Sequence, residues 1–165
     1  MTFWLVGTIE EKGCSGQGCP GCPFHITEDE TYACMCEGCW SALYRAIDLW
    51  NLLKSDKGHK LFRLLKDEIE VEREDGSRIM TRGQIEQVLA LLDGLEDALY
   101  TLTDKNWRIR PEQVDYVLQQ NPSLVTSWQQ DGQWVYTLSN TLGDVLGAAF
   151  FLKAALRLGR EVELD

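Results

Sequence analysis

The chain has 165 residues, of which 44% are hydrophobic and 25% are charged. These proportions are typical of a globular protein and exclude a disordered, collagen-like or low-complexity chain. The 16 Lys and Arg against 26 Asp and Glu give a formal net charge of -10, which disfavours a protein that holds nucleic acid by neutralising phosphates.

The first ten residues, Met1 to Glu10, are rich in β-prone side chains and predict a strand that leads into the cysteine-rich segment. They include one acid, Glu10, and lack the basic region of a signal peptide. No apolar run in the chain approaches the ~20 residues that a membrane-spanning helix needs. We therefore expect no contact with a membrane and a cytoplasmic location.

All six cysteines fall within 26 consecutive positions near the N-terminus. Cys19-Pro20-Gly21-Cys22 and Cys36-Glu37-Gly38-Cys39 form two Cys-x-x-Cys units that are separated by 13 residues. A cysteine cluster at one end of a chain without a signal peptide indicates a metal site rather than a disulfide framework. Four thiolates at this spacing match the tetrahedral coordination of structural zinc, so Cys19, Cys22, Cys36 and Cys39 are the predicted ligands.

Three further residues in this segment are possible additional ligands, namely Cys14, Cys34 and His25. We expect them to surround a single mononuclear zinc site, but they could also complete a second metal site. An iron–sulfur cluster is the alternative cofactor, because Cys34-Met35-Cys36-Glu37-Gly38-Cys39 has a spacing that such clusters use.

Apolar residues at helical spacing follow the second Cys-x-x-Cys unit and predict an amphipathic helix that runs to about Lys54. The segment from Phe24 to Ala33 has room only for a short hairpin or loop. The first Cys-x-x-Cys turn, or zinc knuckle, is followed by a short hairpin and then by a helix whose beginning carries the last two ligands. This order resembles the treble-clef group of zinc fingers over residues 17–54. This resemblance implies metal binding and leaves the function open, because treble clefs serve many functions.

Five basic residues recur every third position from Lys54 to Lys66 and would follow one side of a helix, most simply as a solvated face. Acids then alternate with Ile69 and Val71 up to Asp75-Gly76, which predicts a β-hairpin over Glu68 to Met80. Thr81-Arg82-Gly83-Gln84 has the form of a capping box. The apolar spacing that follows it predicts one helix over residues 82–102, which we expect to form core rather than a dimer seam.

Pro111 and the residues to Gln120 predict a short helix that ends at Asn121-Pro122. Two β-prone runs flank Asp131-Gly132 as a second hairpin. The helix and hairpin together are similar in outline to a winged helix-turn-helix domain, although neither element is basic. Residues 142–158 predict a central buried helix, and residues 161–164 predict a last strand.

These elements predict an α+β fold in which a treble-clef-like zinc module packs on a mainly helical body with two β-hairpins. Residues 1–54 would form the strand, metal-binding module and first helix, and residues 55–165 the body, as one continuous unit. The chain lacks a phosphate-binding glycine loop, a Gly-x-Ser-x-Gly elbow and a His-Glu-x-x-His helix, and it has two histidines, so enzyme activity is disfavoured.

Six Trp residues are more than a small core readily hides, and aromatic residues are enriched at interface centres. We therefore expect a non-enzymatic, zinc-stabilised module that binds a protein partner or joins a larger assembly. The alternatives are a nucleic-acid-associated regulator with zinc knuckles and an iron–sulfur redox protein. The sequence does not specify an oligomeric state.

Overall fold

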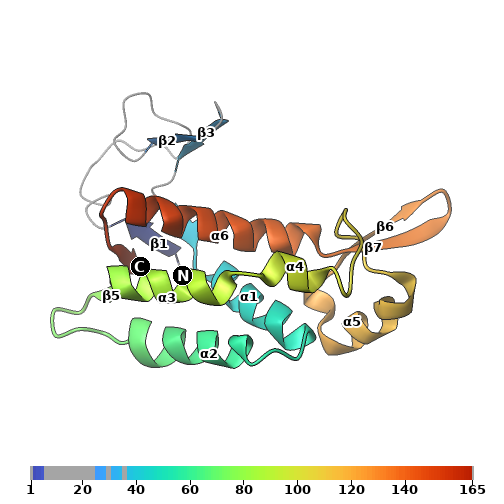
Figure 1. The fold of residues 1–165 in the computed structure, drawn as a ribbon, viewed down its shortest axis with the longest axis horizontal. Coiled ribbons are helices and arrows are strands. Elements are labelled where there is room, and N and C mark those ends of the chain that lie inside the picture. Colours follow the sequence, from blue (N-terminus) through green and yellow to red (C-terminus); the bar gives the residue numbers. More distant parts are fainter. Residues whose placement is uncertain (1, 6–24, 29–30, 35–36, 165) are drawn as a thin grey trace.

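The computed structural model describes residues 2–5, 25–28, 31–34 and 37–164 (Figure 1). Helices and antiparallel strands are both present in this part of the chain, which confirms the α+β class. The helices are α1 (Ser41–Leu52), α2 (Lys57–Arg63), α3 (Arg82–Leu92), α4 (Leu95–Leu99), α5 (Val114–Gln120) and α6 (Ser139–Arg157). A π-helical segment, η1 (Leu64–Ile69), continues α2, and two short 3₁₀ turns, η2 (Pro111–Gln113) and η3 (Pro122–Leu124), flank α5.

Helix α1 begins two residues after Cys39, as the apolar spacing predicts. One of its faces is fully buried, and this face packs against α2 and α6. The indole of Trp50 on this helix donates a hydrogen bond to the carbonyl of Leu91, at 2.9 Å. The phenol of Tyr116, on α5, donates to the carbonyl of Leu52 at 2.6 Å. Helix α1 is therefore held on two sides by segments that follow it in the chain.

A four-stranded antiparallel sheet has the order β4-β1-β8-β5. Its strands are β4 (Glu37–Cys39), β1 (Thr2–Leu5), β8 (Val162–Leu164) and β5 (Arg78–Met80). Phe3 is paired with both Gly38 and Leu164, so the first and last strands are neighbours in the middle of the sheet. The expected N-terminal and C-terminal strands are thus confirmed.

A separate two-stranded sheet pairs β2 (His25–Glu28) with β3 (Thr31–Cys34) in antiparallel register. Both strands lie in the segment between the two Cys-x-x-Cys units, where a short hairpin or loop is expected. Most of the predicted zinc module, residues 6–24, 29–30 and 35–36, lies outside the described residues.

The hairpin predicted over Glu68 to Met80 is wrong. Ile69 is buried at the end of the π-helical segment, whereas Val71 is 53% exposed, so these two apolar residues do not share a strand face. A turn does form at Asp75-Gly76, where Gly76 has φ 81°. Strand β5 follows this turn, but it pairs with β8 rather than with the residues before the turn.

The single helix predicted over residues 82–102 is interrupted. The capping box is present, because the side chains and backbones of Thr81 and Gln84 bond reciprocally. Helix α3 then ends at Leu92, and Gly94 adopts φ 79° before α4 begins. The six apolar residues whose spacing predicts this helix are buried, as expected of core: Ile85, Val88, Leu92, Leu95, Leu99 and Leu102.

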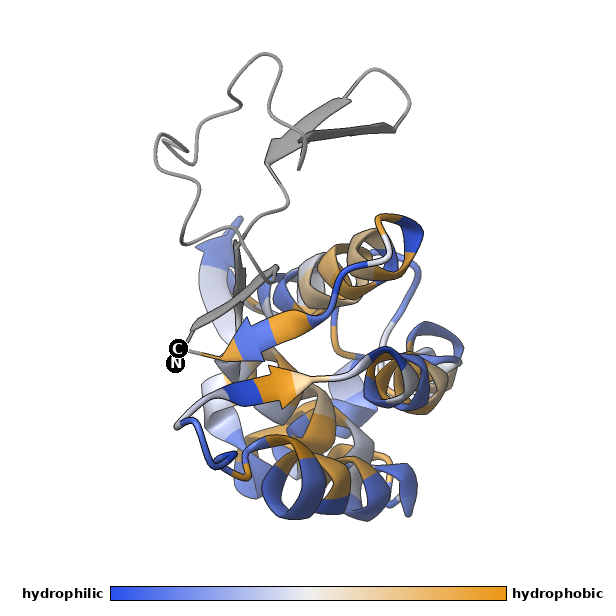
Figure 2. Ribbon diagram, turned by 90° about the vertical axis from the view of Figure 1, so that its left-hand side faces the viewer, coloured by the Kyte–Doolittle hydropathy of each residue, from blue (hydrophilic) through white to orange (hydrophobic). Residues whose placement is uncertain are grey.

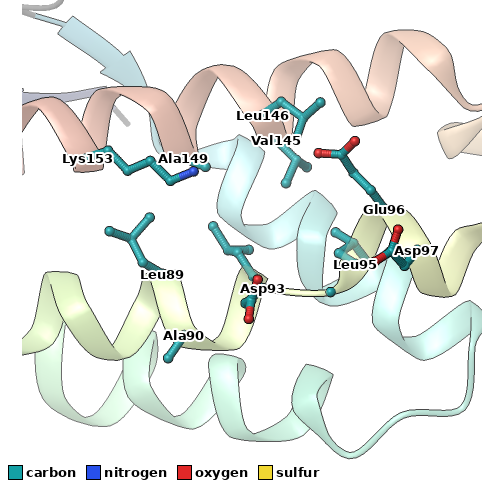
Figure 3. A pocket seen from close by; sticks show the side chains of 12 residues that line it. Leu89, Ala90, Asp93, Leu95, Glu96, Asp97, Val145, Leu146, Ala149 and Lys153 are labelled. Atoms are coloured by element: carbon teal, nitrogen blue, oxygen red, sulfur yellow. The ribbon is translucent and has the colours of Figure 1, made fainter.

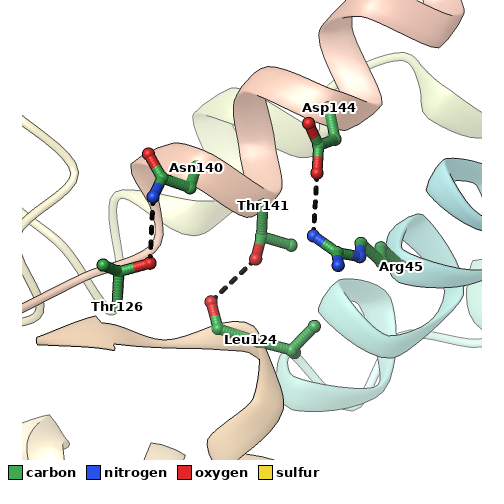
Figure 4. A network of polar contacts seen from close by, with 6 residues as sticks. All are labelled: Arg45, Leu124, Thr126, Asn140, Thr141 and Asp144. Atoms are coloured by element: carbon green, nitrogen blue, oxygen red, sulfur yellow. Dashed lines mark hydrogen bonds and ion pairs between the residues drawn. The ribbon is translucent and has the colours of Figure 1, made fainter.

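The second predicted hairpin is confirmed as β6 (Thr126–Gln130) and β7 (Gln133–Thr137), with positive φ at Asp131 and Gly132. It projects from one end of the molecule (Figure 1). Helix α6 follows directly, and its first turns fasten the hairpin base to the body (Figure 4). Thr141 donates to the carbonyl of Leu124 at 2.8 Å, and Asn140 donates to the hydroxyl of Thr126 at 3.1 Å.

Buried apolar residues from α1 to β8 form one core cluster, and they gather on the inner sides of the helices and strands (Figure 2). Helix α6 contributes a large share of this cluster, which agrees with its expected central position. In the part of the chain that the structure describes, no helix combines the length and apolar character needed to cross a membrane.

Candidate functional site

The predicted metal ligands fall mainly outside the described residues. Cys14, Cys19, Cys22 and Cys36 are in the segments that are not described. Cys39 is the last residue of β4, where it is the register partner of Thr2. His25 begins β2 and Cys34 ends β3, and the two are register partners in the hairpin. Among the described residues alone, no group of three or more His, Cys, Asp or Glu is placed to hold a metal ion.

A polar cluster lies immediately after the last predicted ligand, where the cysteine-rich segment joins the helical body. Trp40 is 3% exposed, and its indole N–H donates to Oε1 of Glu70 at 2.7 Å. The same oxygen accepts a hydrogen bond from the Tyr44 hydroxyl at 2.5 Å. Lys66 lies 2.9 Å from Oε2 of Glu70, whose side chain is 12% exposed. We call these four residues the junction cluster.

The junction cluster keeps a nearly buried carboxylate charged. Burial by itself would raise the pKa of Glu70, but the donors Tyr44, Lys66 and Trp40 together lower that pKa below its ordinary value. Burial and the hydrogen bond to Glu70 raise the pKa of Tyr44. The hydrogen bonds to Glu70 and Tyr44 raise the pKa of Lys66. The arrangement is that of a structural anchor, because each polar group already has a partner.

The basic stretch from Lys54 to Lys66 is engaged within the molecule. Lys57 lies over the ring of Trp50, with Nζ 4.9 Å from the ring centroid, and donates to the carbonyl of Asp93. Lys60 pairs with Asp56 at 3.2 Å. Lys54 precedes α2 and lies over the ring of Tyr116. Because these ammonium groups contact partners of this chain, the stretch does not form the continuous basic face that phosphate binding requires.

The tryptophans divide into two classes by burial. Trp40 and Trp50 belong to the core, and Trp107 is partly buried. Trp128 is 39% exposed and Trp134 is 57% exposed, and both lie on the projecting β6–β7 hairpin. The side chain of Trp4 is outside the described part of the structure.

The two exposed tryptophans lie on opposite faces of the hairpin. Trp128 is the register partner of Val135, whereas Trp134 is the partner of Gln129. Because side chains alternate along a strand, these neighbouring pairs project to opposite sides. Trp134 stacks on Tyr136, with ring centroids 6.5 Å apart. Both faces of the hairpin therefore present an indole.

A cavity of about 460 Å³ lies between the Trp134 side of the hairpin and the loop before α5. It is lined by Ile109, Pro111, Val114 and Tyr136 as well as by the side chains of Asp104, Arg108 and Asp115. Hydrogen bonds within the loop hold the floor of the cavity in place: the Asp104 carboxylate accepts from the backbone N–H groups of Asn106 and Arg108. A hollow lined by both apolar and charged side chains, beside exposed aromatic rings, suits the capture of a partner's side chain.

The outline of helix and wing is present in α5 and the β6–β7 hairpin, but its charge does not suit DNA. Helix α5 carries Asp115 and has no Lys or Arg. The hairpin, from Thr126 to Thr137, also has no Lys or Arg and includes Asp131. Wings and recognition helices contact phosphates and base edges with basic and polar side chains.

No family model, curated protein or solved structure matches the chain. The candidate site was predicted only in part from the sequence. The hairpin and its tryptophans follow from the Asp131-Gly132 signal. The junction cluster was missed, because Glu70 is 30 residues from Trp40 and 26 from Tyr44.

Proposed function

We propose that this protein is a non-enzymatic, zinc-stabilised interaction module that binds a protein partner through the β6–β7 hairpin. Zinc, held by Cys19, Cys22, Cys36 and Cys39 in a treble-clef-like module, would fold the N-terminal segment, and the helical body would carry the binding surface. The observation that carries the proposal is the 57% exposure of Trp134 on a projecting hairpin, whose other face presents a second exposed tryptophan.

Exposed indoles on a rigid support are typical of interface centres, because they bury a large apolar area at little conformational cost. The base of the hairpin is fixed by hydrogen bonds from α6, and its turn has the positive φ values of a tight two-residue connection. The surface is thus preorganised for a partner. Its lack of basic residues favours protein over nucleic acid.

Elemental analysis of protein purified without oxygen tests the metal half of the proposal. We expect one zinc per chain and no visible absorbance, and we expect Cys36→Ser to lose the zinc. Iron with acid-labile sulfide would contradict structural zinc and favour the iron–sulfur alternative. Cys34→Ser serves as the comparison, because it removes a thiol outside the predicted set of four.

Site-specific photocrosslinking in the source cells tests the interaction half. A photoreactive phenylalanine at position 134 should form a discrete covalent adduct with one protein. The same probe at Phe62, which is 43% exposed on α2, is the control for random contact. Adducts of equal yield at both positions, or none at position 134, would contradict a docking role for the hairpin.

A further inference from the structure

Strand β6 has an open edge on the side that faces away from β7. The sheet consists of β6 and β7, and no described segment is hydrogen-bonded to the far side of β6. The far side of β7 is different at its base, because the N–H group of Ile109 donates to the carbonyl of Tyr136 there, at 2.8 Å. Residues 127–130 of β6 are all exposed. The hairpin therefore offers the length of β6 for pairing.

The backbone groups of Ser127 and Gln129 point away from the hairpin. In an antiparallel pair, residues whose backbone groups face each other alternate with residues whose backbone groups face outward. The carbonyl of Tyr136 is turned outward, towards Ile109, so its register partner Ser127 is also turned outward. The alternation gives Gln129, two residues further along, the same orientation. The open edge thus presents the N–H and C=O groups of both residues at the spacing that another strand matches.

Strand β6 lacks the features that keep strand edges from pairing. Exposed edges are usually protected by charged side chains, by proline or by a β-bulge. The strand reads Thr-Ser-Trp-Gln-Gln, without a charge or a proline, and its register with β7 continues without a bulge from Thr126 to Gln130. Trp128, at the centre of the strand, is 39% exposed. The groups on this edge are complemented by a β-strand rather than by a helix or a small ligand.

We propose that β6 pairs in antiparallel register with β6 of a second copy of the chain, about a two-fold axis at Trp128. Ser127 of each copy would lie opposite Gln129 of the other, and each of these two pairs would exchange two backbone hydrogen bonds. Trp128 would lie opposite its own counterpart in a pair without backbone hydrogen bonds, where the Cα atoms are about 4.5 Å apart. The two hairpins would then form one continuous antiparallel sheet.

The symmetry of the edge favours a second copy as the occupant. Ser127 and Gln129 stand at equal distances on either side of Trp128, so one two-fold axis satisfies the outward groups of both copies at once. Directly opposed aromatic side chains stabilise antiparallel pairs, and the close spacing of the central pair brings the two indoles together. A foreign strand could use the same backbone groups, but it would need an aromatic residue at the same position to gain this contact.

The charge of the chain also favours contact at this edge. Two copies with a formal charge of -10 each repel one another, which penalises contacts that bring acids together. In the proposed register Asp131 lies opposite Val125 of the other copy. The two Asp131 carboxylates would therefore be about 20 Å apart along the strands, and salt screens charges at that separation.

The groove between α6 and the α3–α4 pair illustrates the contrast (Figure 3). Its lining carries three acids and one base, namely Asp93, Glu96, Asp97 and Lys153. A second copy that docked there would add its own acidic surface to this excess of acids. The uncharged β6 edge avoids that penalty.

Sedimentation equilibrium of the full chain tests the pairing. We expect a reversible dimer at about 10–500 µM protein, because two short strands make a small interface. Gln129→Pro should weaken dimerisation by about tenfold or more, since it removes an outward N–H group from each copy and leaves the ladder between β6 and β7 intact. Gln129→Ala is the matched control and should dimerise like the wild type, because it keeps the N–H group.

A pair of charged variants tests the position of the axis without proline. Trp128→Lys and Trp128→Glu should each weaken dimerisation by about tenfold or more, because each variant sets like charges opposite each other on the axis. An equal mixture of the two should associate about tenfold more tightly than either variant alone, since the opposed charges then differ in sign. Far-UV circular dichroism checks that each variant is folded.

A wild type that stays monomeric up to about 500 µM would overturn the proposal. A dimer that the variants at positions 128 and 129 leave unchanged would also overturn it, because the copies would then meet at another surface. The inference does not rest on the proposed function. Crosslinking from position 134 reports a foreign protein on the opposite face of the hairpin, so either result can fail while the other holds.

Discussion

Glu70 is the residue that joins the end of the cysteine-rich segment to the helical body. Its carboxylate is the shared acceptor for Trp40, Tyr44 and Lys66, and it is largely removed from water. A buried acceptor that loses its charge leaves its donors less well satisfied, which costs more than the net value of a surface hydrogen bond. Trp40 directly follows Cys39, the last predicted metal ligand. Its hydrogen bond to Glu70 therefore attaches the end of the cysteine-rich segment to the helical body.

Glu70→Gln should lower the free energy of unfolding at neutral pH by about 1–3 kcal/mol, because the amide keeps the shape but loses the charge that three donors share. Urea unfolding followed by circular dichroism measures the change. Glu72→Gln is the matched control on an exposed neighbour and should change stability little. Equal effects of the two substitutions would show that the junction cluster contributes no more than a surface carboxylate.

The same cluster predicts a dependence on pH. The pKa of Glu70 is lowered in the folded protein from the ordinary 4.5, so its ionised form stabilises the fold above that pH. The stabilisation is lost as the pH falls through the lowered value. The difference in unfolding free energy between wild type and Glu70→Gln should therefore shrink as the pH is taken below 4.5. A constant difference from neutral to acid pH would contradict the assignment of the charge to Glu70.

At the scale of elements, the breaks between helices were harder to predict than the helices. The apolar residues from Ile85 to Leu102 keep intervals of three and four across the helix break. The turn at Gly94 still leaves Leu95 and Leu99 buried in the core. Periodicity reports which side is buried, and it does so whether or not the backbone is continuous. The helix break depends on the positive φ of Gly94 alone. A pattern of apolar spacing over many residues does not report the backbone conformation of a single residue.

The strand predicted from the alternating acids between Glu68 and Glu74 was wrong for a different reason. Alternation of polar and apolar residues predicts a strand, but Leu64, Leu65 and Ile69 also fit a helical face, and tertiary burial of that face decides the outcome. The junction cluster was beyond prediction for a related reason, since its partners are brought together by the packing of α1 on α2, which η1 continues. By contrast, the β6–β7 hairpin followed from local turn chemistry alone, although the exposure of Trp128 and Trp134 on it did not.

Two glycines, Gly83 in α3 and Gly94 after it, should give substitutions with effects of opposite sign on stability. Gly94→Ala should lower the free energy of unfolding by about 1–2 kcal/mol, because a side chain at φ 79° is strained. Gly83→Ala should raise it by up to about 1 kcal/mol, because that residue lies in α3 with open space around it. Thermal unfolding of the two variants side by side measures both. A stabilising Gly94→Ala would show that the break between α3 and α4 does not need the left-handed conformation.

At the scale of the whole molecule, the four-stranded sheet links the predicted zinc module to the helical body. β1 precedes the cysteine-rich segment and β4 ends at Cys39, so the two paired strands enclose that segment in the chain. Among the side chains that the structure describes, the core cluster extends from Trp40 to Leu164 and is built mainly by the helices. Order in β1 and β4 should thus depend on the metal, whereas order in the helices should not.

If the proposed zinc is bound, its removal with a chelator should give a partly ordered protein rather than a fully unfolded one. We expect faster hydrogen exchange at residues 2–5 and 37–39 and unchanged protection in α3 and α6. Exchange measured by mass spectrometry on the same sample before and after chelation is the test. Protection that is unchanged in β1 would argue against metal-dependent folding, and protection lost throughout α6 would show that the body requires the metal too.

The pairing of Phe3 with Leu164 also sets an order of events during synthesis. Strand β1 is made well before its neighbour β8, so the middle of the sheet closes after the helices between them have had time to form. The thiols of the cysteine-rich segment are thus made long before the sheet beside them is complete. Capture of the metal by the first 39 residues would protect those thiols long before the sheet that flanks them exists.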